Sequence, residues 1–164
     1  MKLFDFSTLD SARDWYSIND GVMGGLSRSR LSASPLGFAV FSGHVSLANG
    51  GGFASVRCDF ADTNLSAAGY IRLLVKGDGR QYKVNLRDSL APDSPVYQQA
   101  FVSRADDDVW QQVNLPLTEF HARRRGQPLP GISADFSAIK SLGLVIGDRQ
   151  GGDFTLQILS VEAV

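Results

Sequence analysis

The sequence predicts an all-β protein, an antiparallel β-sandwich or jelly roll. Apolar and polar residues alternate with a period of two along many short segments, and turns rich in glycine, proline and asparagine separate these segments. The 3.6-residue period of helices is almost absent, with one helical turn expected near residues 136–140. We therefore expect about ten strands in a single domain that spans residues 1–164.

The clearest strand is residues 81–87, where Tyr82, Val84 and Leu86 point to one face and polar residues to the other. The other expected strands are residues 3–6, a piece near 15, 38–41, 45–47, 53–60, 70–76, 96–104, 109–115, 141–146 and 154–161. Gly77-Asp78-Gly79 predicts a tight hairpin, because an Asp-Gly pair accommodates positive φ. Residues 121–135, rich in arginine, proline and glycine, predict a long irregular loop.

Charge and cysteine content narrow the class of partner and compartment. Lys and Arg number 16 against 17 for Asp and Glu, so no excess of basic charge indicates nucleic acid or an anionic membrane as the main partner. Cys58 is the single cysteine; it is expected to be a small buried hydrophobe in a reducing compartment. No signal-peptide pattern opens the chain and no apolar run reaches 18 residues, so we expect a cytoplasmic protein without membrane insertion.

Residues 15–27 form the strongest local string, with three glycines following Asn19 and Asp20. Glycine lets the backbone turn sharply, and Asn and Asp side chains bond the turn in which they lie. One interpretation is a strained corner of the sandwich. The other is a ligand-binding rim, whose candidate residues are Asn19, Asp20 and Met23. A nucleotide-binding loop is not indicated, because a GxGxxG spacing and a following helix are both absent.

A second string, residues 41–57, places a glycine loop between two strands and ends in an arginine. If Val56 and Cys58 face the core, Ser55 and Arg57 face the wetter side of the sheet. For Arg57 two interpretations remain open. It forms a surface salt bridge that adds about 0–1 kcal/mol, or it recognises a carboxylate or planar polar group through two hydrogen bonds.

These strings, with others along nearly the whole chain, resemble the complex I intermediate-associated protein 30 family, and a short bacterial-type member of it. The matching motifs are Trp15, residues 19–27, residues 41–43, Asn49, residues 51–57, residues 77–80 with Tyr82, and Trp110 with Pro116 and Phe120. The resemblance implies a galactose-binding-like jelly roll, similar to carbohydrate-binding modules. It also implies a binding module or assembly factor, a role best known in building respiratory NADH:ubiquinone oxidoreductase.

Catalytic and metal-binding patterns have little support. His44 and His121 are the two histidines and lie in different segments, and no Ser-His-Asp or Cys-His arrangement is visible. The run Asp106-Asp107-Asp108 fits a solvated turn better than a calcium site, which takes about 6–8 oxygen ligands. We expect no catalytic residue, no metal and no cofactor.

A polar sheet face is the remaining candidate site. The polar residues expected to project away from the core on neighbouring strands are Arg72, Lys83, Asn85, Arg87, Gln99 and Gln112. Tyr97 or Trp110 is expected to add a flat aromatic surface. An ordinary solvent-facing sheet is the alternative.

The sequence thus predicts a non-catalytic module that docks a protein partner, such as a respiratory-complex subunit, through the polar face and the corner of residues 19–25. A carbohydrate-binding domain is the first alternative, opposed by the missing signal peptide. An enzyme acting on a small metabolite is the second, opposed by the missing acid-base residues.

Overall fold

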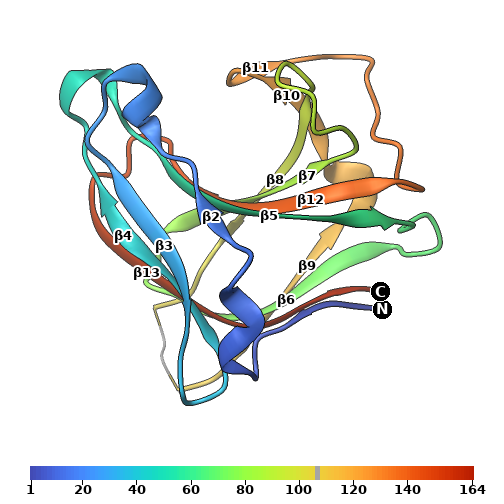
Figure 1. The fold of residues 1–164 in the computed structure, drawn as a ribbon, viewed down its shortest axis with the longest axis horizontal. Helices are drawn as coiled ribbons and strands as arrows, with labels where there is room; N and C mark the ends of the chain where they lie inside the picture. Colours follow the sequence, from blue (N-terminus) through green and yellow to red (C-terminus); the bar gives the residue numbers. More distant parts are fainter. Residues whose placement is uncertain (106–107) are drawn as a thin grey trace.

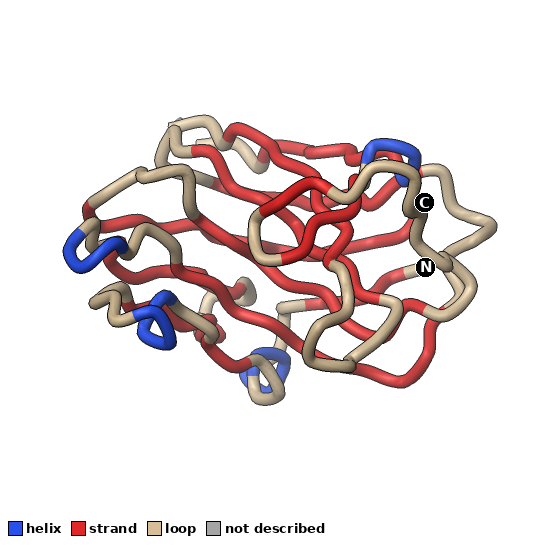
Figure 2. The backbone as a smooth tube through the Cα atoms, turned by 90° about the horizontal axis from the view of Figure 1, so that it is seen from above, coloured by secondary structure: helices blue, strands red, loops and turns tan. Residues whose placement is uncertain are grey.

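The computed structural model describes the backbone of residues 1–105 and 108–164, and their side chains except those of Val22 and Met23. Two antiparallel β-sheets stack face to face (Figure 1), as the sequence predicts. Four single turns of 3-10 helix lie at the margins of the sheets (Figure 2), and no α-helix occurs in these residue ranges. No helix within these ranges is long and apolar enough to cross a membrane.

Sheet A has the strand order β3-β4-β13-β6-β9, with β1 pairing to β13. Its strands are β1 (Lys2–Asp5), β3 (Arg28–Ala33), β4 (Ala39–Val45), β6 (Tyr70–Lys76), β9 (Gln111–Pro116) and β13 (Gly152–Ala163). Sheet B has the order β11-β10-β8-β7-β12-β5-β2. Its strands are β2 (Tyr16–Ser17), β5 (Ala54–Thr63), β7 (Gln81–Arg87), β8 (Val96–Val102), β10 (His121–Arg124), β11 (Gln127–Pro128) and β12 (Ile139–Ile146). The 3-10 turns are η1 (Leu9–Ala12), η2 (Asp20–Met23), η3 (Ala48–Gly50) and η4 (Leu117–Glu119).

The core lies between the sheets and follows the alternation in the sequence. Along β7, Tyr82, Val84 and Leu86 are fully buried, and Ile71, Leu73 and Val75 repeat the pattern along β6. Burying a side chain of this size stabilises the fold by about 1.5–3 kcal/mol. The inward period of two therefore fixes which side chains of each strand remain outside.

The turn at Gly77-Asp78-Gly79 is not a hairpin, so that prediction is wrong. β6 pairs with β13 and β9 in sheet A, whereas β7 pairs with β12 and β8 in sheet B. Gly79 does have a positive φ of 87°. The Asp78 carboxylate accepts hydrogen bonds from the Thr155 backbone N–H of sheet A (2.9 Å) and the Tyr82 hydroxyl of sheet B (3.0 Å). Asp78 therefore bonds both sheets at the point where the chain crosses from one to the other, and its partner in sheet A is 77 positions away.

Residues 121–135 were predicted as an irregular loop, but their first part contains two strands. β10 and β11 form a short hairpin, and β10 extends sheet B by pairing with β8. Arg125 and Gly126 at its tip both have positive φ, which is the geometry of a two-residue hairpin turn. The predicted helical turn near residues 136–140 is absent, since residues 136–138 form a turn and a bend and β12 begins at Ile139. β3 was missed because its alternation of Ser and Arg with few apolar residues reads as a loop.

Candidate functional site

The corner formed by residues 19–27 is held together by one buried carboxylate. The Asp20 side chain is fully buried and accepts hydrogen bonds from the Ser27 hydroxyl (2.6 Å), the Ser27 backbone N–H (3.0 Å) and the Gly52 N–H (2.8 Å). A weaker one comes from the Phe53 N–H at 3.3 Å. Asp20 thus ties η2 to the glycine loop that precedes β5.

Glycines make room for this carboxylate. A Cβ at Gly25 would lie 2.3 Å from Asp20 Cγ, and one at Gly51 would lie 2.6 Å from Asp20 Oδ2. Gly24, with φ of 84°, ends η2 in the left-handed region that favours glycine. Gly25 of the first string and Gly51 of the second therefore both make room for the same buried carboxylate.

The cluster keeps Asp20 ionised. Burial raises the pKa of the carboxyl, but the hydrogen bonds from Ser27, Gly52 and Phe53 together outweigh it, so the pKa lies below the usual value. Because the side chain has no exposed surface, the expectation that Asp20 contacts a ligand is wrong.

Asn19 is half-buried and is also bonded within the fold. Its Oδ1 accepts hydrogen bonds from the Ser29 hydroxyl (2.7 Å) and the Ser55 N–H (3.1 Å), and so connects β3 to β5. The side chain of Met23 lies outside the described part of the structure. The corner is therefore a joint between the two sheets.

Of the remaining predicted residues, the outer face of sheet B carries Arg57, Lys83, Asn85 and Arg87. One row runs across six strands, from β2 to β10, because residues paired across strands point to the same face. The row consists of Tyr16, Arg57, Gly143, Asn85, Gln98 and His121. Asn85 and Gln98 are joined by a 2.8 Å hydrogen bond. Gly143 supplies no side chain, so the row is open between Arg57 and Asn85.

Arg57 is already engaged at one nitrogen. Its Nε donates to the Tyr16 hydroxyl (2.7 Å) and lies 3.2 Å from Asp59 Oδ1, while the guanidinium carbon is 5.2 Å from the Tyr16 ring centre. Tyr16 in turn donates to Asp59 Oδ2 (2.8 Å). These contacts hold the guanidinium in place over the outer face, as both interpretations of Arg57 require.

Arg87 lies in the neighbouring row with Ser141 and Asp59. Burial, and then the charge of Arg57, lower the pKa of its guanidinium. Among the described residues, no hydrogen bond or ion pair is formed by the Arg87 side chain. Arg87 is therefore a half-buried cation beside another cation.

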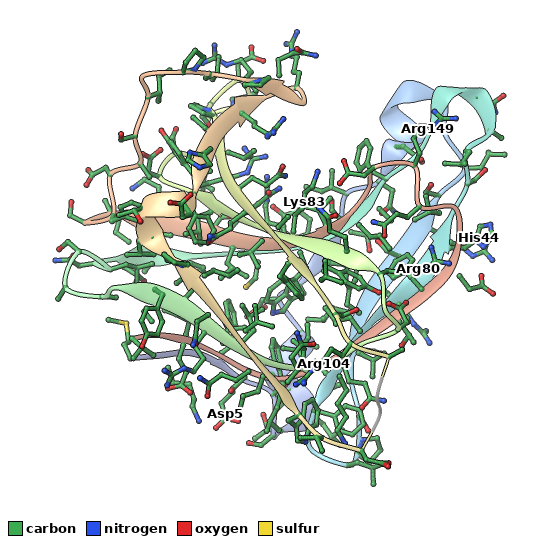
Figure 3. All side chains as sticks on the ribbon, turned by 180° about the vertical axis from the view of Figure 1, so that it is seen from behind. Asp5, His44, Arg80, Lys83, Arg104 and Arg149 are labelled. Atoms are coloured by element: carbon green, nitrogen blue, oxygen red, sulfur yellow. The ribbon has the colours of Figure 1, made fainter. Side chains whose placement is uncertain are left out.

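A pocket of about 520 Å³ lies on the same face, over β7, β8 and β10. Its lining residues are Gln81, Lys83, Gln98, Gln99, Ala100, Glu119, His121, Arg123 and Asp148. Figure 3 shows Lys83 between the raised β10–β11 hairpin and the corner on the opposite side. Lys83 pairs with Asp148 at 2.9 Å and His121 with Glu119 at 3.3 Å. The pocket is thus polar and internally paired.

The predicted polar face does not hold all its members. Arg72 and Gln112 lie on the outer face of sheet A, where Arg72 donates to Asn114 (3.0 Å) and Gln112 pairs with Leu74. Trp110 precedes β9, and its ring contacts Lys76 and Phe38. Periodicity assigns a residue to a face but not to a sheet, so these residues were grouped wrongly.

Two residues of β8 were assigned to the wrong face. Tyr97 pairs with Leu86 and Gln99 with Val84, both fully buried partners. Tyr97 is 2% exposed, and the Gln99 Oε1 atom is buried. Phe101, two positions after Gln99 in the same strand, is buried. Alternation therefore turns Gln99 inward with it, and Gln98 takes the outward position expected for Gln99.

Tyr16, Asp59, Gln98, Ser141 and Arg123 are outer-face residues that the sequence interpretation missed. Asp59 follows Arg57 by two positions, so alternation alone was a sufficient signal for it. Tyr16 lies in a strand of two residues, which is too short for a periodic signal. Of the described residues, no three His, Cys, Asp or Glu side chains are placed to hold a metal ion together. Asp106 and Asp107 of the acidic run lie outside the described residues.

Comparison with known sequences decides the family. The family model of complex I intermediate-associated protein 30 (CIA30) matches residues 4–158. The chain belongs to the CIA30 family. It is also 30% identical, over 156 residues, to the probable complex I intermediate-associated protein 30, mitochondrial, of Caenorhabditis briggsae. The match covers 82% of this chain and 45% of that relative, so the chain spans less than half of the relative's length.

Solved structures similar to this CIA30 chain are sugar-binding modules and enzymes. A family 11 carbohydrate-binding module from Clostridium thermocellum, in complex with a β-1,3-1,4-mixed-linked tetrasaccharide, aligns over 99% of this chain and 95% of its own, with TM-score 0.69 and 16% identity. The agarase AgWH50C aligns over 100% of this chain and 24% of its own, with TM-score 0.64 and 15% identity. These similarities confirm the galactose-binding-like β-sandwich fold. At 15–16% identity they say nothing about the function of this chain.

Proposed function

We propose that this chain is a non-catalytic binding module that docks a partner protein on the outer face of sheet B, as an assembly factor for a respiratory or other membrane complex. The observation that carries the proposal is the open polar row from Tyr16 to His121 across six strands. Membership of the CIA30 family supports subunits of respiratory NADH:ubiquinone oxidoreductase as the partner class.

The charges of this face favour an acidic partner. Arg57, Lys83 and His121 each have an acidic neighbour within 4 Å. Arg87 has no such neighbour in the part of the chain that the structure describes, and Arg123 donates to a backbone carbonyl, that of Gly126. Positive charge therefore remains on the face after internal pairing, and such a surface steers and orients an acidic partner.

The histidines support a non-catalytic role. His44 Nδ1 lies 2.7 Å from Asp153 on sheet A, and His121 Nε2 lies 3.3 Å from Glu119 on sheet B. No serine, cysteine or threonine oxygen or sulfur is hydrogen-bonded to either ring among the described residues. The buried thiol of Cys58 has a pKa raised to about 11, chiefly by burial, which opposes its use as a nucleophile.

Carbohydrate binding is the second candidate, because the 520 Å³ pocket has the size and the amide lining that a short sugar chain requires. The placement of the aromatic residues favours a protein instead. Tyr97 is buried and Trp110 lies beside sheet A. Tyr16 is the aromatic residue of the row, and the Arg57 guanidinium stacks on its ring. Titration with the mixed-linked tetrasaccharide tests this candidate directly.

Site-specific photo-cross-linking tests the protein-docking function. A benzoylphenylalanine replaces Gln98 on sheet B or, as the matched control, Gln112 on sheet A, and the variants are expressed in the native cell. We expect the Gln98 position to cross-link a subunit of NADH:ubiquinone oxidoreductase and the Gln112 position not to do so. Cross-links of equal yield from both faces, or none to such a subunit, would contradict the proposal.

A further inference from the structure

Arg57 and Arg87 are close enough to act on one ligand. Their β-strands, β5 and β7, are separated only by β12, and the two arginines are offset by one step of the outward alternation. The Cα atoms are therefore about 10 Å apart across the strands and about 7 Å along them, within reach of two extended arginine side chains. Between them β12 contributes only Gly143 and Ser141 on this face.

Donors exceed acceptors around this pair. Of the Arg57 nitrogens, only Nε donates a hydrogen bond to the described part of the chain. Asp59 is the acidic group that acts on both guanidiniums, and it already binds Tyr16 and Arg57. The Nη groups of Arg57 and the whole guanidinium of Arg87 thus have no acceptor among the described residues.

A second, independent observation comes from Ser141. Its hydroxyl is buried, lies in register between Asp59 and Arg87, and has no hydrogen-bond partner in the described residues. Buried polar groups are almost always paired, so an unpaired one calls for a partner. The Ser141 hydroxyl therefore lies on the part of the face that carries the two arginines.

We propose that Arg57 and Arg87 form a carboxylate-binding site, which takes an Asp or Glu side chain of the partner protein. Two guanidiniums and the Asp59 carboxylate leave one net positive charge, which a single carboxylate neutralises. The planar fork of arginine matches the two oxygens of a carboxylate. Asp59 opposes a dianion such as phosphate by like-charge repulsion. This inference rests on the proposed protein-docking function and names the chemistry of the partner's contact.

The test uses the full chain and a defined probe, an acetylated and amidated pentapeptide with sequence Gly-Glu-Gly-Glu-Gly, titrated at low ionic strength and followed by NMR. The arginine side-chain N–H signals report binding directly. We expect the wild-type chain to bind this peptide and not its glutamine counterpart. Arg57→Gln and Arg87→Gln should each weaken binding about tenfold, the loss expected for one charge-assisted hydrogen bond.

Arg72→Gln is the matched control, because Arg72 also stacks on a tyrosine, at 5.5 Å from Tyr70, but lies on sheet A. It should leave peptide binding unchanged. An equal loss in Arg72→Gln, no binding by the wild-type chain, or tighter binding of inorganic phosphate through the same two arginines would each overturn the site.

The photo-cross-linking experiment separates this result from the proposed function. Peptide binding without cross-linking to a respiratory-complex subunit keeps the carboxylate site and contradicts the docking function. Cross-linking from the Gln98 position without peptide binding keeps the docking function and overturns the carboxylate site.

Discussion

The Asp20 corner and the Arg57–Arg87 pair are two charged clusters that differ in whether the chain supplies their hydrogen-bond partners. The Asp20 carboxylate is fully buried, and Ser27, Gly52 and Phe53 supply it with donors. Arg87 is half-buried beside a like charge and bonds no described residue. A charge that the fold satisfies stabilises the fold, whereas in our proposal the charge that it leaves unsatisfied serves a partner.

The largest expected effect is at Gly25. Gly25→Val places a Cβ atom 2.3 Å from Asp20 Cγ. The carboxylate must then move, and the Ser27 and Gly52 donors lose their acceptor. We expect a loss of about 3–5 kcal/mol in the free energy of unfolding, measured by urea denaturation. Gly21→Ala is the control, because a Cβ at Gly21 meets nothing within 4 Å. Equal stability of the two variants would refute the idea that the corner is a close-packed joint.

The corner should also respond to acid. The pKa of Asp20 is lower in the folded chain than the value of about 3.9 in the unfolded chain. The stability that Asp20 contributes is therefore fully present above about pH 4 and is lost as the pH falls through the folded value. Urea midpoints of wild type and Asp20→Asn, measured from pH 6 to pH 2, should converge at the acidic end. A constant difference would show that ionisation of Asp20 contributes nothing.

The arginine pair should behave in the opposite way. Replacing both Arg57 and Arg87 with glutamine removes two neighbouring cations, one of them half-buried and unpaired. We expect the melting temperature to stay within a few degrees of wild type or to rise, because an ion pair that water still reaches, as Arg57–Asp59 at 23% and 34% side-chain exposure, contributes about 0–1 kcal/mol. Calorimetry measures it. A double variant that unfolds at room temperature would make the arginines structural.

The last comparison is between two buried serines, and it turns on the smallest single cost, that of Ser141→Ala. Ser27 donates to Asp20 and accepts from the Ser46 N–H, so Ser27→Ala should cost about 1–3 kcal/mol. The Ser141 hydroxyl has no partner in the described residues, so Ser141→Ala should cost less than about 0.5 kcal/mol or stabilise the fold. Urea denaturation of the two variants side by side checks the difference. The reverse order of the two costs would break the comparison between the clusters.

Local alternation was enough to predict the fold class and much of the outer face. The buried series Tyr82, Val84 and Leu86 placed Asn85 and Arg87 outside, and Val56 did the same for Arg57. The positive φ of Gly79 was also predictable from its neighbour Asp78. These features depend on residues within a few positions of each other, which is the range over which alternation and turn chemistry act.

The parts that sequence missed depend on distant partners. The turn at Asp78 is a crossover between the sheets, and its carboxylate binds the Thr155 N–H, 77 positions away in sheet A. Arg72 and Arg57 both project outward from strands of alternating residues, yet they lie on opposite faces of the sandwich. The partners of Asp20 are 7 to 33 positions away. Only the topology shows that the Asp20 carboxylate is buried and that the Arg57 and Arg87 guanidiniums lie on the outer face of sheet B.

The two ends of the chain lie next to each other, and this has a practical consequence. The Met1 amino group donates to the Ala163 carbonyl (2.7 Å), and β1 runs along β13 in sheet A (Figure 1). A short linker joining residues 164 and 1 should therefore allow circular permutation, with new ends opened at an exposed turn such as residues 125–126. A surface tether attached at residue 1 or residue 164, both beside sheet A, would leave the outer face of sheet B turned toward the solution.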